Sequence, residues 1–246
     1  MEPELTPALV LPEADALELL QHAQLTVEGQ LVDASNATLY VCAEHDGVRA
    51  ACVYKPVTGE RPLWDFPDGT LAEREVAAYV VSAASGWDIV PPTVLRDGPF
   101  GPGMVQLWIE TDERCDVRSL LRSGAPALRP VAVLDAVINN ADRKGGHLLP
   151  VPSGHVYGVD HGVCFNVEDK LRTVVWNWAG ESIADEELDV LARLRRDFDA
   201  DLGARLAELL TGAEVRRTRR RIERLLRMTL LPTPTAAWPS VPWPPF

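Results

Sequence analysis

Short apolar runs separated by turn residues open the chain. Residues Glu13–Gln24, with leucines at positions 17, 19 and 20, predict a short helix. Three runs rich in β-branched or aromatic residues follow, and Asp46-Gly47 between the last two is a tight hairpin signal. We therefore expect three antiparallel strands, over Leu25–Val32, Ala37–Ala43 and Val48–Tyr54.

A longer helix is predicted next. It begins at Thr70-Leu-Ala-Glu73, which has the form of a capping box, and Gly86 can end it. Its apolar residues recur on one helix face, with Glu75 beside them: Val76, Tyr79, Val80 and Ala83. Two more apolar runs, Val90–Leu95 and Gly103–Ile109, predict a strand pair. The first part of the chain therefore predicts a small, mostly antiparallel sheet with one long helix packed on it.

The pattern changes beyond Thr111. Residues 111–126 are polar and broken by glycine and proline, which indicates a hinge between two lobes. Leu128–Asn139 predicts a helix, and Ser182–Leu230 is helical in pattern. We expect four parts: an N-lobe (1–110), a linker (111–126), a C-lobe (127–231) and a Pro/Trp-rich tail (232–246).

Two features of the last part of the chain allow more than one interpretation. The tail is either a docking peptide for a protein partner or a segment that folds back over an apolar groove. Seven arginines lie between Arg216 and Arg227, interleaved with apolar residues. They pair with the many acidic side chains, or they bind anionic lipid; the chain's net charge of −12 favours the first.

Composition narrows the class of protein. The chain has 246 residues, 46% of them hydrophobic and 24% charged, which is typical of one large globular domain or two lobes with real cores. The net charge of −12 argues against nucleic acid or an anionic membrane surface as the main partner. It does not exclude a nucleotide, because a divalent cation can bridge carboxylates and phosphates.

The sequence also indicates a compartment. The residues from Met1 to Pro12 do not have the form of a signal peptide, and no apolar run is long enough to cross a bilayer. The four cysteines lack metal-ligand spacing, so we expect them to be small buried residues in a reducing cytoplasm.

Candidate chemistry is concentrated in two loops. One is Asn139–His147, after a helix, and the other is Gly158–Gly162, after a short apolar strand. Each carries a carboxylate beside glycines, Asp142 in the first and Asp160 in the second, a pattern typical of sites for metal-bound phosphates. The alternative for Asp142 is a simple helix-end salt bridge with Arg143.

The proposed roles of these side chains follow from their chemistry. Asp142 can accept the proton of an attacking hydroxyl, and Asp160 can bind the metal ion. His147, five positions after Asp142, is either a metal ligand or a hydrogen-bonded structural residue, and imidazole suits Mn²⁺ better than Mg²⁺. His161 is more typical of a structural residue. Asn139 and Asn140 either cap the loop or contact substrate.

Lys55, which follows a predicted strand upstream of the two loops, is a further candidate residue. A lysine there is usually only the polar end of a strand, but with Glu75 on the next helix it can form the pair that holds nucleotide phosphates in kinases. The order Lys, Glu, Asp, Asp favours this function. Between the first two strands, small residues can let backbone N–H groups approach phosphates: Ser35, Asn36, Ala37 and Thr38.

With these motifs, the chain resembles an actinobacterial family described as similar to phosphatidylinositol 3- and 4-kinases, the SCO1664-like family. The resemblance covers nearly the whole chain. It is carried by Ser-Asn-Ala-Thr (35–38), Ala-Cys-Val-Tyr-Lys-Pro (51–56), Arg-Pro-Leu-Trp-Asp-Phe-Pro-Asp-Gly-Thr-Leu (61–71), Arg-Glu-Val-Ala-Ala-Tyr (74–79), Asn-Asn-Ala-Asp-Arg-Lys-Gly-Gly-His (139–147) and Val-Asp-His-Gly-Val-Cys-Phe (159–165).

The wider group implied is the atypical kinases of the lipid-kinase and HipA-like type. Their catalytic loop reads Asp-Arg-x-x-x-Asn and a later Asp-x-Gly binds metal, which the resemblance maps onto Asp142-Arg143 and Asp160-His161-Gly162. His147 stands where asparagine is expected. The resemblance also implies that adenine contacts a hinge backbone over Gln106–Glu110, which includes Trp108 and Ile109.

The sequence therefore predicts an α+β, two-lobed, protein-kinase-like fold with a small antiparallel N-lobe sheet and a mostly helical C-lobe. The expected function is phosphoryl transfer from ATP, with Mg²⁺ or Mn²⁺, to a lipid, protein or small-molecule hydroxyl. Lys55, Asp142 and Arg143 are the expected catalytic residues, and Asp160 with His147 the metal site. The rival functions are a nucleotide-binding pseudokinase or scaffold, motivated by His147, and transfer of AMP on the same fold.

Overall fold

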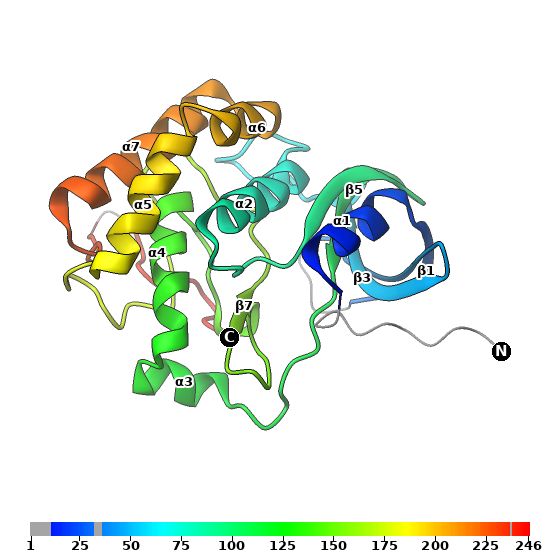
Figure 1. The fold of residues 1–246 in the computed structure, drawn as a ribbon, viewed down its shortest axis with the longest axis horizontal. Helices are drawn as coiled ribbons and strands as arrows, with labels where there is room; N and C mark the ends of the chain where they lie inside the picture. The colour runs from blue at the N-terminus through cyan, green and yellow to red at the C-terminus, as the bar shows by residue number, and fades with distance from the viewer. Residues whose placement is uncertain (1–10, 32–35, 237) are drawn as a thin grey trace. The chain divides into compact units, whose positions relative to one another are not determined.

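The computed structural model describes residues 11–31, 36–236 and 238–246. The chain divides into two compact units, whose elements are drawn in Figure 1. Unit 1 consists of Met1–Val76 and Pro91–Glu110, and unit 2 of Ala77–Val90 and Thr111–Phe246.

Unit 1 is built on a five-stranded antiparallel sheet with the order β1-β2-β3-β5-β4. The predicted strands are confirmed to within a few residues, although the predicted end of the first, Val32, lies outside the described residues. Asp46 and Gly47 both have positive φ, 48° and 80°, as a tight type I′ hairpin requires. The strands are β1 (Gln24–Gln30), β2 (Leu39–His45), β3 (Val48–Pro56), β4 (Thr93–Gly98) and β5 (Gly101–Leu107).

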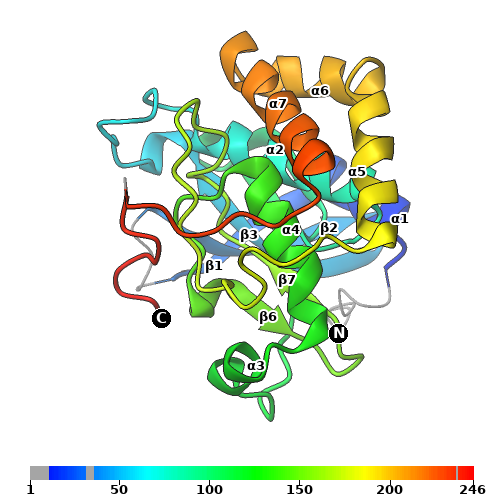
Figure 2. The same cartoon turned by 90° about the vertical axis from the view of Figure 1, so that its left-hand side faces the viewer.

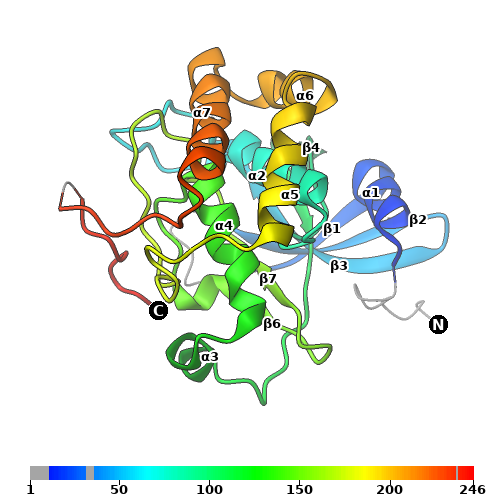
Figure 3. The same cartoon turned by 60° about the vertical axis from the view of Figure 1, so that its left-hand side comes forward.

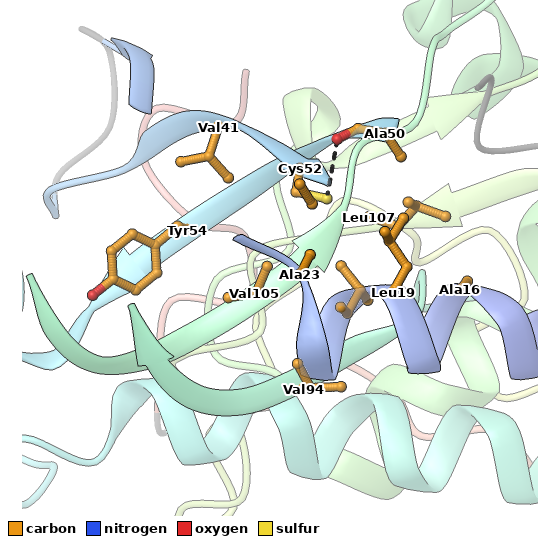
Figure 4. Packing of buried hydrophobic residues seen from close by; sticks show 12 residues of the cluster. Ala16, Leu19, Ala23, Val41, Ala50, Cys52, Tyr54, Val94, Val105 and Leu107 are labelled. Carbon is orange, nitrogen blue, oxygen red and sulfur yellow. Dashed lines mark hydrogen bonds between the residues drawn. The ribbon is translucent and has the colours of Figure 1, made fainter. Parts of the chain in front are cut away.

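Helix α1 (Glu13–His22) covers one face of this sheet, with Leu19 among the buried side chains (Figure 4). Leu20 is buried in the same cluster. Side chains alternate along a strand, and in β3 the buried ones include Cys52 and Tyr54. Burying an apolar side chain of this size contributes roughly 1.5–3 kcal/mol, so the contact fixes which face of β3 is inside. Lys55, one position after Tyr54, therefore lies on the opposite face of the sheet.

Three cysteines fit the prediction of small buried residues. Cys42, Cys52 and Cys164 are buried, whereas Cys115 is half-buried, and none forms a disulfide in the part of the chain that the structure describes. Burial raises the pKa of the Cys52 thiol to about 12. Cys52 therefore stays protonated and acts as an apolar residue.

Helix α2 (Leu71–Ser85) begins where the sequence predicts but is capped differently. The N–H groups of Leu71 and Ala72 donate to the Glu60 carboxylate at 3.1 and 2.9 Å. The Thr70 hydroxyl instead donates to the Pro67 carbonyl at 2.8 Å. A carboxylate from the preceding loop thus satisfies the first turn and complements the helix dipole, which a local sequence pattern does not reveal.

We expect Glu60→Ala to destabilise the protein by about 0.5–2 kcal/mol, because two backbone donors at the start of α2 lose their acceptor. Urea denaturation measures the free energy of unfolding. Asp68→Ala removes the same charge from an exposed position of the same loop and serves as the control. Equal effects of the two substitutions would show that Glu60 does not cap the helix.

Unit 2 is mostly helical, with one two-stranded antiparallel sheet (Figures 1 and 2). The predicted linker, residues 111–126, contains a helix of its own, whose first turn is capped by Asp116 and which ends at Gly124 in the left-handed conformation. The elements are α3 (Val117–Ser123), α4 (Arg129–Ile138), β6 (Leu148–Pro150), β7 (Val156–Gly158), α5 (Asp185–Asp197), α6 (Asp201–Leu209) and α7 (Gly212–Met228), with single 3₁₀ turns η3 (Pro126–Leu128) and η4 (Gly145–His147); the turn η2 (Val57–Gly59) belongs to unit 1.

Four arginines of α7 contact acidic side chains, as the intramolecular interpretation predicts. Arg221 and Arg224 contact the Asp169 carboxylate at 3.0 and 2.7 Å. Arg219 contacts Asp199 at 3.1 Å and Glu223 at 3.0 Å. The apolar stripe of the same helix, with Ile222 and Leu225, is buried.

The Pro/Trp-rich residues after α7 fold back along unit 2. Figures 2 and 3 show this segment in red, leaving α7 and running without helix or strand towards the end of the chain. The Ser240 carbonyl accepts hydrogen bonds from the Thr173 backbone N–H at 3.0 Å and from the Trp176 indole N–H at 2.9 Å. Among the described residues, no helix combines the length and the apolar character needed to cross a membrane.

Candidate functional site

The lysine and glutamate singled out in unit 1 come together. Lys55 Nζ, at the end of β3, lies 2.7 Å from the Glu75 carboxylate on α2. Only 2% of the Glu75 side chain is exposed. A buried carboxylate is stable as a charge only when it is paired, so this contact fixes the ammonium group on the sheet face opposite to α1.

The small residues between β1 and β2 are already engaged in the protein where they are described. The Ala37 N–H donates to the Gly59 carbonyl at 3.1 Å, and the buried Thr38 hydroxyl donates to the Asn36 carbonyl at 3.3 Å. The Asn36 side chain accepts the Arg61 N–H at 2.9 Å. Ser35 lies outside the described residues.

The predicted hinge follows β5. The buried Gln106 amide donates to the Thr93 hydroxyl at 2.8 Å, so its side chain is part of the sheet. The Trp108 N–H donates to the Ala51 carbonyl at 3.0 Å, and the Trp108 ring meets Tyr40 edge-on. Beyond it, Ile109 is buried and Glu110 is exposed.

In unit 2, the Asp142 loop (residues 139–147) is shaped by two asparagines. Asn139 ends α4 in the left-handed conformation, and its amide binds the carbonyls of Asn166 and Glu168 and the N–H of Lys170. Asn140 is completely buried; its amide donates to Asp135 at 3.0 Å and accepts the Asp142 N–H at 2.9 Å. Both amides are therefore capping groups that hold the loop.

Asp142 itself remains accessible, with 30% of its side chain exposed. Lys144 Nζ lies 3.0 Å from the Asp142 carboxylate. Lys144 was not among the site residues predicted from the sequence. A signal for it was present, since a cation two positions after an acid in a loop can turn back towards it.

Asp160 and His147 are neighbours. Asp160 has a φ of 61°, in the left-handed region, and its side chain is 45% exposed. His147 Nε2 lies 3.3 Å from the Asp160 carboxylate, while Nδ1 accepts the Lys144 N–H at 3.4 Å. Since Nδ1 is the acceptor, Nε2 carries the proton and faces Asp160.

The charge state of His147 agrees with this arrangement. Burial lowers the pKa of the His147 imidazole, although the Asp160 carboxylate acts in the opposite direction. The ring is therefore neutral at pH 7, with its Nε2 beside the Asp160 carboxylate.

Arg143, in the Asp142 loop, contacts the second loop (residues 158–162) in the interior of unit 2. Its guanidinium is fully buried and binds the buried Asp135 carboxylate, the shortest distance being 3.0 Å. It also donates to the Val159 carbonyl at 2.9 Å and contacts the ring of the buried His161. A Cβ on Gly158 would lie 3.2 Å from the guanidinium, so a glycine makes room for it.

The burial of Arg143 determines what it can do chemically. The guanidinium is enclosed, and its contacts link the Asp142 loop to the Asp160 loop (residues 158–162). His161 contacts the same guanidinium.

The donor set in unit 2 matches a hard divalent cation held partly by substrate. Among the described residues, no group of three His, Cys, Asp or Glu side chains forms a metal cluster. Mg²⁺ in phosphoryl-transfer sites takes one or two carboxylates and completes its shell with phosphate oxygens and water. The exposed Asp160 carboxylate fits that requirement.

No family model matches the chain. It is similar to plant lipid kinases, to solved kinase structures and to a mycobacterial protein. It is 25% identical to phosphatidylinositol 4-kinase gamma 4 of rice, over 67% of this chain, and 29% identical to phosphatidylinositol 4-kinase gamma 4 of Arabidopsis thaliana, over 54%. The chain covers only 36% and 29% of the length of those two proteins.

Solved structures show the fold. The Golgi casein kinase with Mn/ADP bound aligns with a TM-score of 0.60 and 14% identity, over 88% of this chain and 75% of that one. The Helicobacter pylori proinflammatory kinase CtkA aligns with a TM-score of 0.51 and 10% identity, over 86% and 94%. The predicted kinase-like α+β fold, with an antiparallel N-terminal sheet and a helical C-terminal region, is confirmed.

One relative is much closer in sequence. Protein Rv2133c of Mycobacterium tuberculosis is 43% identical over 94% of this chain and 96% of its own length. The chain belongs to the family of Protein Rv2133c.

Proposed function

We propose that this protein is an atypical kinase, which transfers the γ-phosphoryl group of ATP to a hydroxyl with the help of Mg²⁺ or Mn²⁺. The observation that carries the proposal is the arrangement in unit 2, where Asp142 and Asp160 lie on two loops joined through Arg143, both with accessible carboxylates. The Lys55–Glu75 pair and the phosphatidylinositol 4-kinase relatives support it.

Each residue has a role in the proposed reaction. Lys55 neutralises the phosphates that are not transferred, and Asp160 holds the metal ion, which supplies charge stabilisation on the phosphates when bound. Asp142 orients the acceptor hydroxyl and accepts its proton. Lys144, paired with Asp142, adds positive charge for the transferred group.

His147 and the loop before β2 have more limited parts in this proposal. His147 Nε2 binds a metal ion only after losing its proton, so we assign His147 to orienting Asp160. Because Ala37 N–H and the Thr38 hydroxyl already have partners, the phosphates are assigned to Lys55. Adenine is assigned to the backbone of Trp108, Ile109 and Glu110.

The acceptor class stays open in this proposal. A lipid headgroup, a protein serine or threonine, and a small metabolite all carry the hydroxyl that Asp142 requires. The SCO1664-like family, which the motifs resemble, is the proposed subgroup, and the cytoplasm is the proposed compartment.

ATP labelled at the α or the γ position separates the possible reactions. We expect label to move only from the γ position, in Mg²⁺ or Mn²⁺, to one of a panel of lipid, peptide and metabolite acceptors. Transfer from the α position alone would mean AMP transfer and would overturn the kinase proposal.

Thermal unfolding tests nucleotide binding itself. ATP at 100 times its Kd stabilises the folded protein by about 2.7 kcal/mol, which raises Tm by roughly 5–10 °C for a chain of this size. A shift with metal and ATP but no transfer to any acceptor would favour the pseudokinase, the alternative suggested by His147. With no shift in either metal, every ATP-based function is wrong.

A further inference from the structure

The last residues of the chain contact the Asp142 loop. We name residues 240–246 the closing segment. The Gly145 N–H, in the middle of the Asp142 loop, donates to the Pro245 carbonyl at 2.8 Å. Neither a kinase fold nor the proposed roles of Asp142 and Asp160 require this contact.

A second route links the closing segment to the same loop. Thr173 forms a parallel bridge with Arg143, and its N–H donates to the Ser240 carbonyl at 3.0 Å. The Thr173 hydroxyl binds Asp135 at 3.2 Å, the carboxylate that holds Arg143. Ser240 is thus attached to the buried network beneath the loop, while Pro245 is attached to the loop itself.

Phe246 packs directly on Gly145. A Cβ on Gly145 would overlap the Phe246 ring, so only glycine allows the ring to sit there. The Arg118 guanidinium lies 4.1 Å from the ring centroid, a cation–π contact. A pocket of 300 Å³ borders this contact and is lined by Gly145, Gly146 and Phe246 among others.

The closing segment leaves the reactive groups accessible. The Asp142 and Asp160 side chains are 30% and 45% exposed with the segment in place. The contacts are made to the backbone between Asp142 and His147. This arrangement braces the loop and does not block it.

We propose that the closing segment is a positioning element for the Asp142 loop. Pro245 and Phe246 hold Gly145, and Gly145 lies between Asp142 and His147, so both side chains keep their places. Loops that carry reactive groups are usually mobile, and a displacement of about 1 Å can cost about 100-fold in rate. The catalytic part of this inference rests on the proposed kinase function.

Hydrogen exchange tests the brace without any assay of activity. In the full-length Phe246→Ala variant, we expect the amides of residues 144–147 to exchange at least about ten times faster than in the unsubstituted protein. Trp243→Ala is the matched control, because Trp243 is in the same segment but 85% exposed. Unchanged exchange in Phe246→Ala overturns the inference whether or not the protein transfers phosphate.

Kinetics test the consequence. Phe246→Ala should lower kcat about 10-fold or more with KM for ATP within about twofold, because binding groups are retained while the loop is displaced. Phe246→Tyr, which keeps the ring, should restore kcat, and Trp243→Ala should equal the unsubstituted protein. A rise in kcat for Phe246→Ala would mean that the segment is inhibitory and would overturn the proposal. Failure of the unsubstituted protein to transfer phosphate would instead overturn the proposed function.

Discussion

Asp142→Asn should lower kcat for γ-phosphoryl transfer about 10²–10⁴-fold, the usual contribution of a positioned general base. Asparagine keeps the shape of the side chain and accepts no proton. Tm should stay within a few degrees, because Asp142 is partly exposed and the Asn140 amide binds its backbone N–H rather than its carboxylate. Steady-state kinetics with the acceptor found by γ-label transfer, together with thermal unfolding, measure both quantities.

The same substitution at Asp189 provides the control. Asp189 is exposed on α5, outside both loops, so Asp189→Asn should leave kcat and Tm unchanged. If Asp142→Asn retains more than about a tenth of the rate, Asp142 does not take the proton, since general-base catalysis contributes at least about 100-fold. The pseudokinase would then be the better description.

Arg143→Met should destabilise the protein by about 3–5 kcal/mol, which is a large fraction of the stability of a typical domain. The substitution leaves the Asp135 carboxylate buried without its cation, although Asn140 and Thr173 still donate to it. Chemical denaturation of both forms measures the loss. Arg220→Met, at an exposed position of α7, should change stability by no more than about 0.5 kcal/mol.

A second substitution separates the charge from the packing. In Arg143→Met with Asp135→Asn, the buried carboxylate is gone while the amide oxygen still accepts from Thr173. The double variant should be more stable than Arg143→Met alone, because the largest cost is the unpaired charge. The single variant Asp135→Asn is measured as well. If the double variant loses as much stability as the two single variants together, this account of the buried pair is wrong.

Elements that depend on local pattern were predicted well. The strands and the helices α1, α2 and α4 follow from alternation, from helical spacing and from the Asp46-Gly47 turn, which are properties of neighbouring residues. The cap of α2 was not predicted correctly. Its carboxylate comes from Glu60, ten or more positions before the N–H groups that it binds, and no capping motif spans that distance.

In the candidate site, too, features set by nearby elements could be predicted, and features set by distant residues could not. The order of Lys55 and Glu75 indicated a pair, because a strand end and the following helix are natural neighbours in this fold. The enclosed position of Arg143 did not follow from its sequence neighbours. It depends on Asp135 from α4 and on Val159 and His161 from the second loop, and burial created by two separate segments leaves no local pattern.

The burial of Arg143 is reflected in the sequence at Gly158, which lies beside the guanidinium. Its φ lies outside the left-handed region, so no turn explains why a glycine ends β7. A Cβ there would lie 3.2 Å from the guanidinium of Arg143, fifteen positions earlier in the chain, and 3.3 Å from the Ile89 side chain, so both crowd this position. Such a glycine is informative when it ends a strand with an ordinary φ close to a candidate acid. It indicates a position where side chains from elsewhere in the chain pack against the backbone.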